Sequence, residues 1–172
     1  MKKFFPLLVV AILVMMIFVL KDSNDKGAID HKNAEYIIDG REIQLTNGVS
    51  VLEIKTGAML KITTRYFGNE VVKDLNGDGR KDIAFLLTQD GNGSEPIYYV
   101  VAALNTENGY VGSEGFLLGD RIAPQTTEFR DGVLIVNYAE RGPNEPMTVR
   151  PSFGKSAYLK LNTKTMKLEV VR

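Results

Sequence analysis

The chain of 172 residues has no cysteine, no tryptophan and a single histidine. The missing cysteines exclude disulfides, thiolate zinc sites, a thiol nucleophile and lipid attachment through a cysteine. His31 lies in a polar stretch just after an apolar N-terminal run, so we expect it to be a solvated linker residue. A Ser–His–Asp triad needs an imidazole held inside the folded domain, which argues against most hydrolases of that kind.

The chain also lacks an excess of either charge, with 21 basic and 21 acidic residues. Without Lys2, Lys3 and Lys21, which flank the apolar run, residues 22–172 carry 18 basic against 21 acidic side chains. Phosphate binding requires clustered Lys and Arg, so we expect no nucleic acid partner. The length fits one domain plus an anchor.

An uncharged run of 17 residues extends from Phe4 to Leu20. As a helix it would be about 25 Å long, near the lower limit for crossing a bilayer core of about 30 Å. We expect an uncleaved transmembrane anchor over residues 4–20, with the C-terminal part outside the cytoplasm. A cleaved signal peptide is one alternative, although no small-x-small pair follows the run. A buried helix of a soluble domain is another.

Residues 21–34 are polar and of mixed charge, which is typical of a flexible stalk. Residues 35–172 show short strand-like runs separated by turn pairs, and no sustained helical period. The turn pairs are Asp39-Gly40, Asn47-Gly48, Asn108-Gly109 and Asp131-Gly132. Such pairs favour tight hairpins, because the two central residues of the turn need positive φ, which Asn, Asp and Gly adopt readily. The predicted fold class is therefore all-β, a compact sandwich or partly closed barrel of hairpins preceded by one N-terminal transmembrane helix.

Two runs, 83–87 and 98–103, are apolar at consecutive positions, which predicts central strands buried on both faces. Residues 141–153 contain three prolines and are expected to form a long loop or an edge.

One loop has the residue pattern of a metal-binding site. Residues 74–82 have the form D-x-N-x-D-G-x-x-D, with oxygen donors at loop positions 1, 3, 5 and 9 and a glycine at position 6. We predict a Ca²⁺ site made by the side chains of Asp74, Asn76, Asp78 and Asp82 and by the Arg80 carbonyl. Position 12 is Phe85 where an EF-hand requires Glu, so a strand–loop–strand site is expected. The alternative is an Asx-rich turn without metal.

The stretch Asp74–Asp82 followed by Ile-Ala-Phe-Leu-Leu resembles the calcium loops of FG-GAP/VCBS-type and dockerin-like repeats, in a single copy. A broader resemblance, over most of residues 33–171, is to a family of bacterial envelope β domains with no established activity. It is based on residues 64–70, 74–79, 98–104 and 118–127. Members of that family stand behind a membrane anchor or beside lysozyme-inhibitor (MliC) and META-type domains. The resemblance implies a bacterial envelope setting and supplies no catalytic residue. Together with the predicted anchor it leads us to expect a single-pass protein of the bacterial cytoplasmic membrane.

Three functions are consistent with these patterns. The first is a non-enzymatic envelope module that binds a protein or a cell-wall ligand. The second is an inhibitor of a lysozyme-type cell-wall hydrolase, and the third a cell-envelope hydrolase using Ser152 and Lys155 in an S-x-x-K arrangement. The first is favoured, because no catalytic constellation accompanies the serine. Its expected contact residues are Arg121, Arg141, Asn144 and Arg150.

Overall fold

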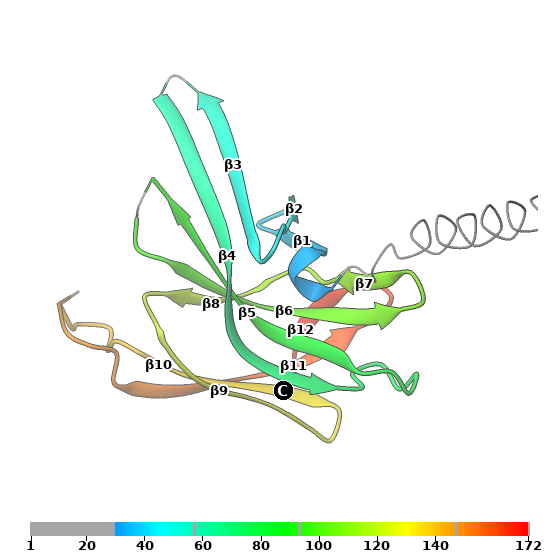
Figure 1. The fold of residues 1–172 in the computed structure, drawn as a ribbon. Helices are drawn as coiled ribbons and strands as arrows, with labels where there is room; N and C mark the ends of the chain where they lie inside the picture. Colours follow the sequence, from blue (N-terminus) through cyan, green and yellow to red (C-terminus); the bar gives the residue numbers. More distant parts are fainter. Residues whose placement is uncertain (1–29, 57, 93, 147, 172) are drawn as a thin grey trace, which may run out of the picture.

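The computed structural model describes residues 30–56, 58–92, 94–146 and 148–171 (Figure 1). Within these ranges the only helix is a 3-10 turn at His31–Asn33. The strands are β1 (Glu35–Ile38), β2 (Arg41–Gln44), β3 (Val49–Thr56), β4 (Ala58–Lys73), β5 (Asp82–Gly91), β6 (Ile97–Thr106), β7 (Gly109–Gly112), β8 (Phe116–Asp120), β9 (Ala123–Arg130), β10 (Val133–Glu140), β11 (Phe153–Asn162) and β12 (Lys167–Val170). The predicted all-β class is confirmed.

The strands form three sheets. The largest has the order β3-β4-β5-β6-β7, with β8 also paired to β6; the others are β12-β11-β10-β9 and β1-β2. Every strand pair is antiparallel, as expected where short turns join consecutive strands. In Figure 1 the β9–β12 sheet lies below the largest sheet, and the β3–β4 hairpin projects away from both.

Strands β5 and β6 form the centre of the molecule. Phe85, Tyr99 and Val101 are fully or almost fully buried on the face that packs against β1 and β2. Leu86 and Val100 are fully buried on the opposite face, against the β9–β12 sheet. Because successive side chains of a strand point to opposite faces, one strand serves both cores. The prediction that these runs are central is confirmed.

The β1–β2 sheet lies very close to the segment that follows β7. The Ile37 N–H donates to the Ser113 carbonyl at 3.3 Å, and the Gly115 N–H donates to the Ile37 carbonyl at 2.8 Å. A Cβ on Gly112 would lie 2.1 Å from the Glu35 carbonyl oxygen. Glycine is therefore required here for close backbone approach.

The residues before β1 differ from the predicted stalk. His31 packs against the rings of Tyr66, Phe85 and Tyr110, with ring centroids 5.3–5.9 Å apart. Ala34 is buried. The expectation that His31 is a solvated linker residue was wrong, because three aromatic rings give the imidazole an apolar site. Residues 4–20 and 21–29, the predicted anchor and most of the stalk, lie outside the described residues, and the described part contains no helix of a length and apolarity that would cross a membrane.

Three of the predicted turns have positive φ at both residues: Asp39-Gly40, Asn47-Gly48 and Asp131-Gly132. The first and third close hairpins, whereas the second leads the chain from the small sheet into the largest one. The fourth prediction was wrong, since only Gly109 of its pair has positive φ. Thr106 and Gly109 are paired, so the turn residues are 107 and 108.

Candidate metal centre

The predicted calcium loop occupies residues 74–81, between the end of β4 and the start of β5. Gly77 and Gly79 have φ values of 84° and 86°, a region that glycine adopts without steric cost. The loop is mostly exposed, whereas Asp82, the first residue of β5, is fully buried. The loop is thus a sharply turned surface segment with one acidic residue in the interior.

Asp74 folds the loop around its carboxylate. Its Oδ1 accepts from the Gly77 N–H at 2.7 Å, and its Oδ2 accepts from the Gly79 N–H at 2.9 Å. These N–H groups, that of Gly79 above all, lower the pKa of the Asp74 carboxyl, because they favour its charged form. Asp74 is therefore a carboxylate at neutral pH.

Asn76 and Asp78 bind each other across one turn. The Asp78 N–H donates to Asn76 Oδ1 at 3.0 Å, and Asn76 Nδ2 donates to Asp78 Oδ2 at 3.1 Å. The Arg80 N–H donates to Asp78 Oδ1 at 2.8 Å. The Arg80 guanidinium lies 3.6 Å from Asp78 and 3.8 Å from Glu107, so it connects the loop to the turn between β6 and β7.

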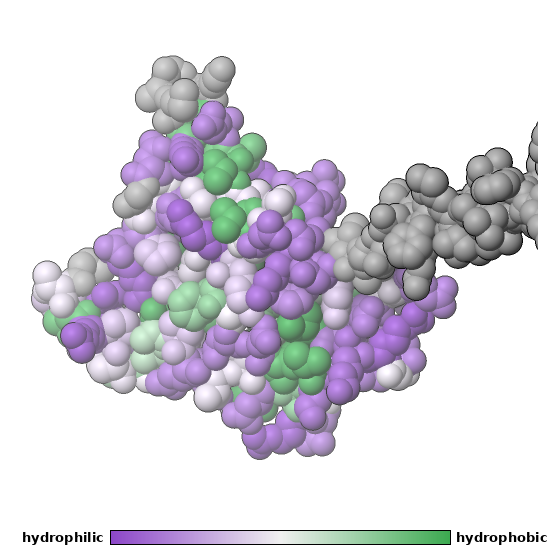
Figure 2. Space-filling model, in the orientation of Figure 1, coloured by the Kyte–Doolittle hydropathy of each residue, from purple (hydrophilic) through white to green (hydrophobic). Residues whose placement is uncertain are grey.

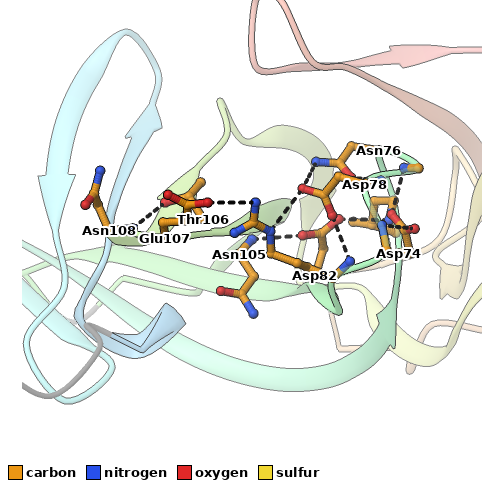
Figure 3. Close-up of polar contacts among 12 residues, drawn as sticks. Asp74, Asn76, Asp78, Asp82, Asn105, Thr106, Glu107 and Asn108 are labelled. Carbon is orange, nitrogen blue, oxygen red and sulfur yellow. Dashed lines mark hydrogen bonds and ion pairs between the residues drawn. The ribbon is translucent and has the colours of Figure 1, made fainter.

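Asp82 fastens the loop to the neighbouring strand (Figure 3). Its Oδ2 accepts from the Leu75 N–H at 2.9 Å, and its Oδ1 accepts from the Asn105 N–H at 2.8 Å. Burial raises the pKa of this carboxyl, and the charges of Asp78 and Asp74 act in the same direction, while the two N–H donors oppose the shift. Both oxygens of this buried acid satisfy backbone donors from two different segments.

The structure brings together only part of the predicted ligand set. In the described residues, no group of three Asp, Glu, His or Cys side chains is close enough to hold a metal ion. Asp74, Asn76 and Asp78 share the loop but are turned toward its own N–H groups, and Asp82 is turned toward Leu75 and Asn105 (Figure 3).

The donor chemistry nevertheless fits Ca²⁺. Carboxylate, amide and carbonyl oxygens are hard ligands, and a carboxylate that accepts one N–H per oxygen keeps a second lone pair on each. Binding requires Asn76 and Asp78 to rotate and Arg80 to release Asp78. The calcium site stays a prediction. The sequence pattern does not reveal Asn105, because it binds Asp82 through its backbone N–H. It does not reveal Glu107, the partner of Arg80, because Glu107 is distant in sequence from the motif.

The Pro-rich segment borders a cavity of about 280 Å³, lined by Gly119, Asp120, Ile122, Glu140, Arg141, Gly142, Pro143 and Glu145. Of the predicted contact residues, Arg141 lines this cavity. The Arg141 side chain donates to the carbonyls of Arg121 and Val149. Asn144 and Arg150 are exposed outside this lining.

The S-x-x-K pair does not form a catalytic arrangement here. Ser152 immediately precedes β11, and Lys155 lies on that strand. Residues three apart on a strand point to opposite faces, whereas activation of a serine needs one helical turn. The Lys155 ammonium binds Glu140 at 2.6 Å instead.

Comparisons of the chain with protein-family models, with curated proteins and with solved structures found no match. The likeness to bacterial envelope β domains therefore stays an expectation from the sequence.

Proposed function

We propose that this protein is a membrane-anchored, extracytoplasmic envelope domain that binds a protein or cell-wall ligand without catalysis. In this proposal residues 4–20 span the bacterial cytoplasmic membrane, and the loop at 74–82 binds one structural Ca²⁺. The main support is the set of oxygen donors that one loop holds together, with Asp74, Asn76 and Asp78 within one turn of the chain.

The ion would add to the hydrogen bonds that already join the loop to β5 and β6. Asp74 and Asp78 belong to an exposed loop, while Asp82 begins the central strand β5. A cation between them would offset the mutual repulsion of three carboxylates and fix the loop against the β6–β7 turn. The expected role is stabilisation of the fold, which suits a scaffold that presents a binding surface.

The size of the effect can be estimated by mass action. Extracellular calcium modules bind with a Kd of about 10⁻⁴–10⁻³ M. At about 1 mM Ca²⁺ such a site adds roughly 0.4–1.4 kcal/mol to the free energy of unfolding. Cytosolic calcium would leave a site of this affinity empty, which is consistent with an exported domain.

Calcium titration of the full chain in detergent micelles tests the metal site. We expect the melting temperature of the β domain to rise with Ca²⁺ by about 2–5 °C, and to return to its starting value with EDTA. Asp78→Asn preserves the shape of the side chain and removes one charged ligand, so its melting temperature should not respond to calcium. Lys160→Gln, an exposed change on β11, is the matched control and should respond as the wild type does.

Equal melting temperatures of the wild type in Ca²⁺ and in EDTA would show that the loop is an Asx turn without metal. Fusion reporters at the C-terminus test the topology separately. A periplasmic reporter should be active and a cytosolic one silent, and the reverse pattern would contradict the anchoring.

A further inference from the structure

The β3–β4 hairpin leaves four large apolar side chains partly exposed to solvent. Val49, Val51, Leu52 and Leu60 are 41%, 49%, 37% and 36% exposed. The projecting hairpin carries green, hydrophobic residues in Figure 2. Contiguous apolar patches of this kind mark a site of interaction with a partner or a membrane.

The apolar patch lies mainly on one face of the hairpin. Leu52 is paired with Ile62, and Ile54 with Leu60, so these four residues share one face. Val49 and Val51 alternate with them and belong to the opposite face. Strand β3 is also an edge of its sheet, since β4 is its only neighbour in the strand order. The face with Val49 and Val51 also carries Glu53, Lys61 and Arg65. A hairpin with one apolar face and one face of mixed polarity suits the boundary between a bilayer and water.

The charge of the hairpin differs in sign from that of the rest of the domain. Residues 49–65 contain three basic side chains and one acidic one, a formal +2. The rest of residues 22–172 contains 15 basic and 20 acidic side chains, a formal −5. Arg65 is paired with Asp90 of β5, which leaves a smaller positive excess on the hairpin itself. This distribution favours an anionic surface and disfavours a second copy of the same hairpin.

The predicted anchor joins the domain beside this hairpin. The Gly48 N–H donates to the Lys32 carbonyl at 2.8 Å, and the Asn47 N–H donates to Asn33 Oδ1 at 2.8 Å. The residues that follow the linker thus lie against the start of β3. Nine linker residues, 21–29, reach at most about 30 Å, and an eight-residue strand is about 26 Å long. The hairpin is therefore within reach of the bilayer that would hold residues 4–20.

We propose that the β3–β4 hairpin inserts its Val and Leu side chains into the head-group region of that same bilayer, where anionic phospholipid favours its basic residues. The inference rests on the proposed anchoring. Insertion stays at the interface, because the free backbone edge of β3 needs water or head groups as hydrogen-bond partners. Docking of this kind would fix the orientation of the domain on the membrane.

The absence of cysteine from the chain permits a direct test with single-cysteine variants. The full chain is placed in vesicles of phosphatidylcholine and phosphatidylglycerol that contain a lipid-attached nitroxide quencher. A fluorophore is attached at Leu52→Cys, at Val51→Cys as a second position on the hairpin, or at Tyr158→Cys as control. Tyr158 is 49% exposed on β11, in the other large sheet. A label at Asp22→Cys, next to the apolar run, reports the anchor independently.

Docking predicts quenching at positions 22, 51 and 52 and little at 158. Adding Leu60→Ser should lower the ratio of docked to undocked domain about tenfold. Lys61→Ala should lower the same ratio about fivefold, and only when phosphatidylglycerol is present.

Quenching at 22 with none at 51 and 52 would overturn docking and leave the anchor intact. No quenching at 22 would show that the anchoring itself is wrong. If the labelled Leu52→Cys protein shows no quenching and the unlabelled variant forms a disulfide-linked dimer, the face belongs to a second copy, which also overturns docking.

Discussion

Asp82 and Asn105 are joined by a hydrogen bond of 2.8 Å between a buried carboxylate oxygen and a backbone N–H, 23 residues apart in the sequence. The second oxygen of Asp82 accepts from Leu75 within the loop. One side chain therefore decides where the loop lies relative to β6. This role requires no metal, so it is separable from calcium binding.

Asp82→Asn should lower the free energy of unfolding by about 1–3 kcal/mol even in EDTA, where no calcium contributes. An amide of the same shape offers one acceptor oxygen, so the partly buried N–H of either Leu75 or Asn105 loses its partner. Urea unfolding followed by circular dichroism measures the change. Asp78→Asn is the matched control, because Asp78 is exposed and its loss should matter only in calcium. Equal stability of Asp82→Asn and wild type in EDTA would contradict the fastening role.

His31 should make the stability of the domain depend on pH. Its Nε2 is buried without a hydrogen-bond partner among the described residues, and burial lowers the pKa of its imidazole. Lys32 acts in the same direction, while Asp30 and Glu70 oppose it. In the unfolded chain the imidazole titrates near pH 6.5. The unfolded state therefore binds the proton first as pH falls.

The contribution of His31 to the free energy of unfolding is fully present above about pH 6.5. It declines as pH falls from that value toward the lower pKa of the folded state, by at most about 1.4 kcal/mol per pH unit. His31→Gln removes the titration and keeps a polar side chain. Urea unfolding of both proteins between about pH 7.5 and pH 5 isolates the effect, since the carboxylates titrate in both. Parallel curves for the two proteins would rule out a buried neutral imidazole.

Gly112→Ala should destabilise the domain by about 1–3 kcal/mol or more, because overpacking forces the backbone apart. The added Cβ would lie 2.1 Å from the Glu35 carbonyl oxygen and 2.6 Å from the Tyr36 ring. Gly154→Ala on β11 is the matched control, as no atom lies within 4 Å of its added Cβ. That control should be neutral or slightly stabilising. Thermal unfolding distinguishes the two, and equal melting temperatures would contradict the close approach of β1.

Arg141→Met should release the Pro-rich segment. The guanidinium binds the carbonyls of Val149 and Arg121, which joins this segment to the turn between β8 and β9. We expect faster cleavage by a broad-specificity protease within residues 142–150, mapped by mass spectrometry, with a loss of global stability below about 1–2 kcal/mol. Arg150→Met is the control, since Arg150 is exposed and should leave the cleavage rate unchanged. Equal cleavage of both variants would refute this role for Arg141.

Much of the fold is readable from local patterns. Asp39-Gly40 and Asp131-Gly132 predict their hairpins, because positive φ is a property of two adjacent residues. The runs 83–87 and 98–103 predict the central strands, because a sheet covered on both faces needs apolar residues at consecutive positions. Nothing in the local pattern predicts strands β8 and β9, since their sequences are short or polar and their pairing is decided by β6 and β10.

The sequence by itself determined the all-β class, three of the four predicted turns and the chemical character of the loop at 74–82, because each depends on residue types a few positions apart. Only the tertiary structure decided that His31 is packed among aromatic rings, that Gly112 must lack a side chain, and that Asp82 binds the backbone of Asn105. Those three relationships join segments far apart in the chain. Their existence depends on how the sheets pack, which no local pattern encodes.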